Sequence, residues 1–246
     1  MTAIEYTLFH RFMACSISAV FLGIASQSAQ ADGLAVDKIY APYVNALEKE
    51  LEYRISRAQG GLQAPNGIII QRLGFGAAIS DTLALEAYVI GRGDDDASSF
   101  SGYELEARWQ LTEQGEYPVD WGVIVEYENS RDSDVEELAT KLIALREWGS
   151  YIFTGNAGLI YEDSEATGAE FETSLSVQAR YRYKPFLEPA LEFYAAEDYR
   201  GIGPALVGMT RLSTTDSIRW ELGSVIGLNE SSADYTLRLM LEYEFY

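Results

Sequence analysis

The chain has 246 residues, with 38 acidic side chains against 18 basic ones, so its formal net charge is −20. This charge argues against nucleic acid as a partner, because phosphate contacts need clustered Lys and Arg. The chain contains one cysteine and one histidine, Cys15 and His10. A single cysteine excludes an internal disulfide framework.

The first 31 residues, 1–31, are typical of a secretory signal peptide. Arg11 supplies a positive charge, Met13–Ala25 is an apolar run, and Ala29-Gln30-Ala31 matches a cleavage site. The run is too short to be a membrane-spanning helix. Cleavage would give a mature chain without histidine or cysteine, which excludes Ser-His-Asp, Cys-His and zinc chemistry. We therefore expect no enzyme, no metal site and no cofactor.

The next segment, 32–46, is predicted to be a short irregular periplasmic lead that contains Pro42. Nothing in its pattern decides whether it folds back into the following domain, 47–246. From residue 47 onward, apolar and polar residues alternate with period 2, which predicts β-strands. Most of these strands have about the ten residues that a tilted strand needs to cross a bilayer. The predicted strands are 47–58, 67–79, 82–92, 102–111, 119–129, 136–147, 151–161, 170–183, 187–196, 205–212, 218–228 and 235–245.

Two of these strands are less clear than the others. The segment 136–147 has aliphatic residues on both faces and would also fit a helix, and 205–212 is short. The count is therefore about twelve, with ten as the alternative. The small residues Gly74 and Gly76 lie within a predicted strand, where they would ease its curvature or leave space in the interior.

The connections and the aromatic residues distinguish the two ends of the strands. With the amino terminus taken as periplasmic, outward connections such as 93–101 and 197–204 should be longer and more acidic than the inward ones. Trp148 and Tyr181 lie near the proposed inward turns, and Tyr161 lies near the outward loops. Two belts of aromatic side chains are typical of the two interfaces of a membrane.

The chain ends on a regular strand whose apolar face is Leu237, Leu239, Leu241, Tyr243 and Phe245. The stretch Leu241-Glu242-Tyr243-Glu244-Phe245 resembles the C-terminal signature of Gram-negative outer-membrane β-barrel proteins. The resemblance implies location in the cell outer membrane, with Leu241, Tyr243 and Phe245 as an assembly signal. It also implies outer-membrane lipid, lipopolysaccharide and the barrel-assembly machinery as partners. Tyr246 follows the signature as an additional residue, which we expect to overhang the last strand.

The beginning of the predicted mature chain carries a second resemblance. Asp37-Lys38-Ile39-Tyr40, Pro42-Tyr43-Val44 and the stretch from Glu48 to Arg54 are similar to the start of a set of uncharacterised porin-like proteins. Together, the patterns and the two resemblances predict an all-β fold. This fold is a single antiparallel up-and-down transmembrane β-barrel of about twelve strands.

The polar face of each strand should point into the lumen, where lipid is absent. Glu48, Glu50 and Glu52 on the first strand should meet the acids of the last strand. Such carboxylates would repel each other unless Arg54, Arg238 or a bound cation intervenes. The lumen-lining candidates are Glu48, Glu50, Glu52, Arg54, Glu104, Glu106, Arg108, Glu126, Glu172, Arg180, Arg182, Glu192, Arg219, Glu221, Arg238, Glu242 and Glu244.

This lining predicts a narrow porin or channel for small solutes with cation preference, because acidic side chains exceed basic ones. The alternative is a closed structural or interaction barrel that acts as the membrane partner of a periplasmic or surface protein. In that case Glu–Arg pairs would fill the lumen. A pair of carboxylates for sugar hydrolysis does not stand out among so many acids.

Overall fold

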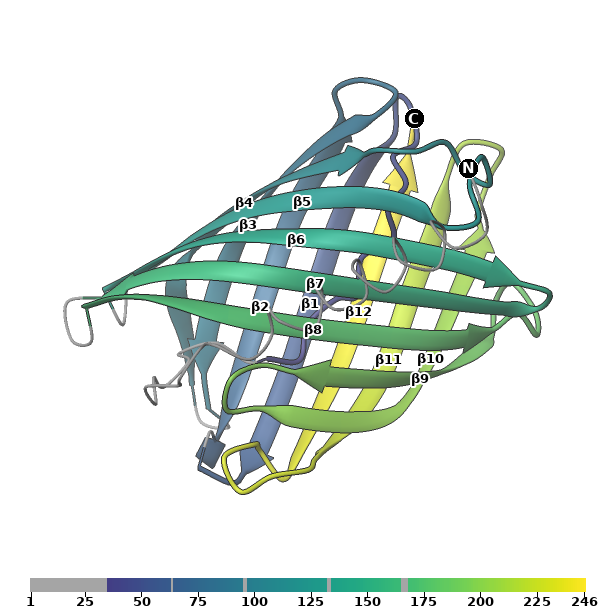
Figure 1. The fold of residues 1–246 in the computed structure, drawn as a ribbon. Helices are drawn as coiled ribbons and strands as arrows, with labels where there is room; N and C mark the ends of the chain where they lie inside the picture. Colours follow the sequence, from purple (N-terminus) through teal and green to yellow (C-terminus); the bar gives the residue numbers. More distant parts are fainter. Residues whose placement is uncertain (1–34, 63, 95–96, 132–133, 165–167) are drawn as a thin grey trace, which may run out of the picture.

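The protein is a closed barrel of antiparallel strands (Figure 1). The computed structural model describes residues 35–62, 64–94, 97–131, 134–164 and 168–246. Each strand pairs with its neighbours in chain order, and β12 pairs with β1 to close the barrel. The predicted all-β up-and-down barrel is therefore confirmed. The predicted signal peptide lies outside the described residues.

The twelve strands correspond one to one with the predicted ones. The segment that would also have fitted a helix is a strand, β6, whose outward leucines alternate with buried residues such as Ile143. The bounds are β1 Lys49–Gly60, β2 Ala64–Ala78, β3 Leu83–Gly93, β4 Ser98–Gln110, β5 Asp120–Ser130, β6 Val135–Trp148, β7 Tyr151–Ser164, β8 Gly168–Tyr181, β9 Glu188–Ala195, β10 Arg200–Arg211, β11 Ser217–Gly227 and β12 Tyr235–Phe245.

Strand β10 begins earlier than predicted, at Arg200 instead of residue 205. The sequence suggested a turn because Gly203 and Pro204 lie in this stretch. In the structure both residues pair with β9, whereas on the β11 side the pairing resumes only at Ala205. Proline has no backbone N–H to donate, so it is tolerated where the neighbouring ladder is interrupted.

The prediction that outward connections would be longer than inward ones was wrong. Several strands extend into the stretches assigned to outward loops, which leaves connections such as 94–97 and 196–199. The longest connection, 111–119, lies at the opposite end of the barrel. Turn-forming residues near a strand end marked loops in the sequence, but pairing with the adjacent strand continues through them.

The outer surface of the barrel is apolar. Leu105, Leu142 and Leu222, from three different strands, are each 46–50% exposed, while charged residues such as Glu106 on β4 and Glu221 on β11 are buried. A soluble sheet with such an apolar surface would aggregate, whereas a barrel that faces lipid needs apolar side chains on its outer surface. Among the described residues, no helix is long and apolar enough to cross a membrane.

Aromatic pairs mark both rims of the apolar surface. The rings of Tyr151 and Tyr181 lie 5.2 Å apart near the end where β1 starts and β12 finishes, which we name the terminal end. Tyr161 and Phe171 lie 5.2 Å apart at the opposite end, which we name the far end. Rings at both rims are the arrangement expected at two membrane interfaces.

The described part of the predicted lead, residues 35–46, lies inside the barrel (Figure 1). We name these residues the N-terminal segment. It runs from the far half of the lumen back to the terminal end. It then reverses into β1 through a turn in which the Glu48 N–H donates to the Asn45 carbonyl. Leu47 in this turn has a φ of +67°, a left-handed conformation that branched side chains rarely adopt.

Candidate functional site

The predicted lumen residues lie on the inner face of the barrel wall, most of them buried. Glu48 precedes β1 and is half-buried, and Arg182 follows the end of β8 and is exposed. Arg108, Arg180 and Arg219 are half-buried. The buried members are Glu50, Glu52, Arg54, Glu104, Glu106, Glu126, Glu172, Glu192, Glu221, Arg238, Glu242 and Glu244.

Ion pairs join these side chains across strands. Arg72 on β2 contacts Glu104 on β4 at 2.9 Å and Glu128 on β5 at 3.1 Å. Arg108 contacts Glu86 at 2.8 Å. A buried charge is tolerated only when it is paired and hydrogen-bonded, so these contacts satisfy much of the inner face.

We expected Arg54, Arg238 or a bound cation to neutralise the acids on β1 and β12, and this prediction was partly wrong. Arg54 does contact Glu52. Arg238, however, turns to Glu192 and lies 2.9 Å from Glu221. Arg219 takes part instead, at 2.8 Å from Glu244. A further cation, Lys38, comes from the N-terminal segment.

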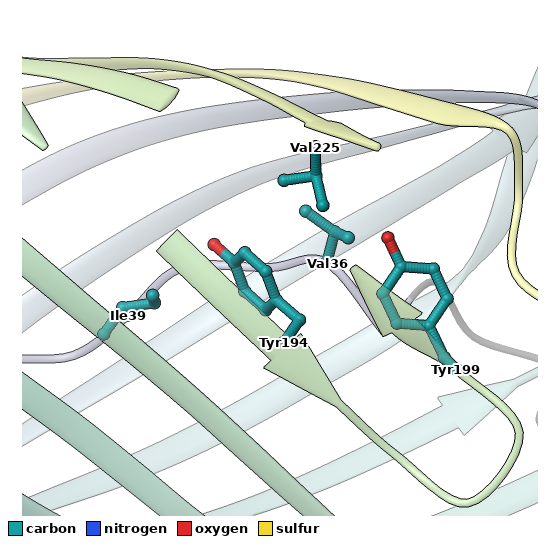
Figure 2. Close-up of a cluster of buried hydrophobic side chains, with 5 residues drawn as sticks. All are labelled: Val36, Ile39, Tyr194, Tyr199 and Val225. Atoms are coloured by element: carbon teal, nitrogen blue, oxygen red, sulfur yellow. The ribbon is translucent and has the colours of Figure 1, made fainter. Parts of the chain in front are cut away.

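Apolar contacts anchor the far half of the N-terminal segment. Val36 is 2% exposed and Ile39 is 7% exposed. Figure 2 shows Val36 between Val225 and the rings of Tyr194 and Tyr199. These partners come from β9, the β9–β10 connection and β11. The segment therefore covers one side of the lumen with a small apolar cluster.

Two charged residues of the segment pair with the wall in its middle. Asp37 accepts hydrogen bonds of 3.1 Å from the Arg54 guanidinium to both of its carboxylate oxygens. The Lys38 ammonium contacts Glu52 and lies 3.1 Å from the Glu242 carboxylate. The side chain of Lys38 is only 8% exposed, so its charge depends on these partners.

The backbone of the segment is held by a side-chain amide. The Tyr40 N–H donates to Asn156 Oδ1 at 2.8 Å, and Asn156 Nδ2 donates to the Tyr40 carbonyl at 2.9 Å. The Tyr40 hydroxyl donates to Glu106 at 2.7 Å, and its ring packs on Ile124 and Ile143. The segment does not pair with a strand here. The side-chain amide of Asn156 therefore satisfies the backbone N–H and carbonyl of Tyr40, as a neighbouring strand would.

The remaining contacts fix the segment near the terminal end. Pro42 is fully buried and faces Gly122 on β5, where an added Cβ would lie 2.9 Å from the proline Cβ. The Tyr43 hydroxyl donates to Asp120 at 2.7 Å, and the Val44 N–H donates to Gln110 at 2.8 Å. Glycine at position 122 therefore leaves the space that the proline fills.

The predicted space-making glycines serve the same purpose elsewhere in the lumen. An added Cβ at Gly76 would lie 2.8 Å from the side chains of both Glu50 and Glu86. At Gly74 it would collide with the ring of Tyr88. Glycine at these positions lets bulky lumen residues occupy the inner face of β2.

Two cavities flank the segment. One, of about 160 Å³, opens toward the far end, and the other, of about 610 Å³, opens toward the terminal end. Lys38 is the one described residue that lines both cavities. The lumen is therefore divided near the contact between Lys38 and the wall.

Sequence reasoning missed the residues on the segment side of this site. Asp37, Lys38 and Tyr40 lie in an irregular stretch without periodicity. Asn156 and Tyr194 share the inward parity of their strands, so alternation could have added them to the lumen candidates. Which of them touch the segment depends on contacts between residues more than a hundred positions apart.

Comparison with known proteins supports the fold. No family model matches the chain, and no curated protein matches its sequence. An outer membrane channel from Pseudomonas putida F1 is 15% identical, with a TM-score of 0.54 over 85% of this chain and 99% of that one. The KdgM porin in complex with disordered oligogalacturonate is 12% identical, with a TM-score of 0.53 over 80% and 98%. The NanC porin is 7% identical, with a TM-score of 0.52 over 80% and 99%.

These identities are low, so the likeness concerns the fold. The chain has the closed β-barrel fold of outer-membrane porins and channels, the fold that the resemblance of its C-terminal strand implied.

Proposed function

We propose that the protein is an outer-membrane channel for small solutes with a preference for cations. The observation that carries the proposal is the pair of cavities, one from each end of the lumen, which meet the N-terminal segment at Lys38. In the described conformation the segment lies between the two cavities and is held there by non-covalent contacts. The described conformation corresponds to a closed channel, and displacement of the segment would join the two cavities.

The charge of the lining supports the preference for cations. The far cavity is lined by seven acidic and four basic described side chains, and the terminal cavity by six acidic and five basic ones. If the segment moved out of the lumen, Asp37 and Lys38 would leave with it. Acidic residues would still outnumber basic ones in both cavities. Fixed negative charge along a narrow path attracts cations and repels anions.

The barrel orientation and its assembly signal are part of the same proposal. The terminal end, where the C-terminal signature on β12 finishes, faces the periplasm. The face formed by Leu241, Tyr243 and Phe245 on β12 is the signal read by the assembly machinery. Lipid and lipopolysaccharide surround the apolar outer surface.

Planar-bilayer recordings test the channel function. The full mature chain and a variant without residues 32–46 would be folded in detergent and inserted under a gradient of KCl. We expect larger and more frequent conductance steps from the deletion variant, because the two cavities then join. The reversal potential of both proteins should have the sign of potassium selectivity. Absence of steps from both folded proteins would contradict the channel function, and chloride selectivity would contradict the preference for cations.

A closed structural or interaction barrel is the second candidate. It is favoured by the ion pairs that cross the lumen beside the segment, such as those of Arg54 with Asp37 and Glu106 at 3.1 Å. Such a barrel would conduct in neither form. The same recordings therefore distinguish the two functions.

A further inference from the structure

Three buried carboxylates meet at the seam that closes the barrel. Glu52 on β1 and Glu242 on β12 are direct partners in the register, and Glu50 lies two residues earlier on the same face of β1. The three side chains are 6% exposed or less. One carboxylate oxygen from each lies within 4.8 Å of the other two. Like charges in directly opposed positions destabilise a strand pair, so this arrangement needs a cation.

The cation at the centre of this seam comes from the N-terminal segment. The Lys38 ammonium contacts both Glu52 and Glu242. The third acid has no basic partner as close: Glu50 Oε1 is buried and accepts no hydrogen bond from the described residues. Its nearest ion-pair partner is Arg108, at 4.0 Å. The negative charge at the seam is thus neutralised only when a cationic group reaches it from the lumen.

The geometry of the three carboxylates suits an ammonium group. An ammonium has three N–H donors in tetrahedral directions. Three acceptors about 2.9 Å from such a nitrogen are about 4.7 Å apart, so carboxylate oxygens that all lie within 4.8 Å of one another can surround one ammonium. Magnesium requires oxygens about 2.1 Å from the ion, and calcium takes about six to eight of them. The ring of Tyr40 lies 5.3 Å from the Lys38 ammonium and adds a favourable cation–π contact.

The position of this group along the lumen gives it a role in passage. Lys38 is the described residue that the two cavities share. A cationic solute that crosses the lumen after the segment has moved would therefore meet the same three carboxylates midway. Binding sites of moderate strength along a path assist entry without preventing exit.

We propose that Glu50, Glu52 and Glu242 form a binding site for the alkylammonium group of a small cationic solute, and that Lys38 fills this site in the closed channel. The solute class rests on the channel function proposed above. The binding itself does not, because the three carboxylates are present whether or not the barrel conducts.

Chemical rescue tests the site. In the full mature chain, Lys38→Ala removes the ammonium and leaves space for a free amine, and Lys38→Met retains the apolar stem without the charge. The melting temperature in detergent would be followed by circular dichroism while n-butylammonium is added. We expect it to rise by several degrees for Lys38→Ala, less for Lys38→Met, and not for the unsubstituted chain, whose site is filled.

Matched controls separate the site from general effects of the ligand. Lys49→Ala removes an exposed lysine at the start of β1 and should show no rise. Lys38→Ala combined with Glu52→Gln and Glu242→Gln should lose the rise. Tetramethylammonium, which has no N–H, and n-butanol, which has no charge, should not replace n-butylammonium. Equal effects of either compound, or a persistent rise in the triple variant, would overturn the proposal.

A second variant applies if Lys38→Ala fails to fold. Lys38→Cys would be the only cysteine of the predicted mature chain. Aminoethylation of the thiol in urea rebuilds an ammonium before refolding, and carbamidomethylation adds a neutral group instead. We expect a folded barrel with the first modification and a several-fold lower folded fraction with the second. Equal folded fractions would overturn the proposal.

Two further outcomes have a definite meaning. A larger stabilisation of Lys38→Ala by Ca²⁺ or Mg²⁺ than by n-butylammonium would assign the site to a metal ion and overturn the ammonium site. Stabilisation by n-butylammonium without any channel conductance would retain the site and contradict only the channel function. Failure of the inference and failure of the proposed function are therefore distinguishable.

Discussion

At the scale of single residues, the charges of the lumen depend on which partners the fold brings together. Arg54 was expected beside Glu52 and lies there, whereas Arg238 contacts Glu192 and Glu221. Side-chain parity predicts that both arginines point inward. It does not predict which wall of the lumen a long side chain will reach.

Tyr246 is the last residue of the chain, and it lies beyond the end of β12 at Phe245. Its hydroxyl donates to Glu48 at 3.0 Å, and partial burial together with this hydrogen bond raises the pKa of the phenol. An exposed hydrogen bond of this kind contributes at most about 1.5 kcal/mol. We expect deletion of Tyr246 to leave the folded fraction unchanged in heat-modifiability electrophoresis.

Deletion of both Phe245 and Tyr246 is the matched comparison, since Phe245 pairs with Lys49 in the closing register. We expect that deletion to reduce assembly. A comparable loss from removing Tyr246 alone would show that the terminal aromatic residue is Tyr246 and that the register of the assembly signal is shifted by one.

Gly122 provides the space for Pro42. In Gly122→Ala, the new methyl group would lie 2.9 Å from the proline Cβ, so either the segment or β5 must shift. Overpacking of this kind costs about 1–3 kcal/mol, which would raise the displaced fraction of the segment by about 5- to 150-fold. We expect more frequent channel openings in planar bilayers.

Gly155→Ala is the control for this substitution. The nearest atom to its added Cβ, within the described residues, is the Ser176 carbonyl oxygen at 3.9 Å, an ordinary contact distance. Its opening frequency should match that of the unsubstituted chain. The role assigned to Gly122 fails if the two alanine variants behave alike.

At the scale of elements, the strands and the N-terminal segment follow different rules. Strands could be placed from period-2 alternation because their pattern is local. The segment has no such pattern, and its position is set by partners on β1, β5, β7 and β12. The sequence therefore left its location open.

Asn156 on β7 is the main support of the segment backbone. Asn156→Leu would remove both of its hydrogen bonds with Tyr40 and leave buried backbone groups unsatisfied, at a cost of about 1–3 kcal/mol. We expect the segment to leave the lumen more often. Trypsin cleavage after Lys38 in the folded barrel should become at least several-fold faster, since cleavage follows the open population.

Thr154→Val is the control for this prediction. Thr154 lies two residues earlier on the same inner face of β7, and it is 5% exposed. Its cleavage rate should remain close to that of the unsubstituted chain. An unchanged rate for Asn156→Leu would show that the apolar cluster around Val36 holds the segment without the amide.

At the scale of the whole molecule, the usual distribution of residues is reversed. The described buried residues include many charged side chains, and the apolar ones form small separate clusters. Most of the large aliphatic and aromatic residues lie on the outer surface. Stability of this barrel therefore depends on its lipid environment and on the pairing of charges in the lumen.

Leu222 tests the lipid-facing surface. It is 49% exposed at the middle of β11, where it pairs with Leu206 and Leu239. Leu222→Arg should lower the free energy of unfolding in phospholipid vesicles by about 2–4 kcal/mol, because the charge would lie at the bilayer midplane. Denaturant titration followed by tryptophan fluorescence measures this change.

Leu111→Arg is the depth control, since Leu111 follows the end of β4 near the terminal end and is 55% exposed. Its cost should be only about 0–1 kcal/mol, as expected near an interface. If both arginine variants were equally stable in vesicles, the apolar outer surface would not be facing lipid.

The sequence by itself determined a barrel of about twelve strands, the outward and inward faces of most strands and the aromatic rims. These features follow from alternation along a single strand, so neighbours in the chain suffice to predict them. Strand ends were less certain: β10 begins before its Gly-Pro stretch, because pairing with β9 decides where a strand starts. The relative length of the connections was mispredicted for the same reason.

Only the tertiary structure decided where residues 35–46 lie and which cation neutralises the closing seam. Lys38 is 14 positions from Glu52 but 204 from Glu242. An irregular segment carries no periodicity that would signal such a contact. The acids of β1 and β12 were recognisable as a cluster that needs a cation, and closure of the barrel around the segment supplied it from Lys38. Charge imbalance can be detected locally, whereas its compensation depends on residues distant in the chain.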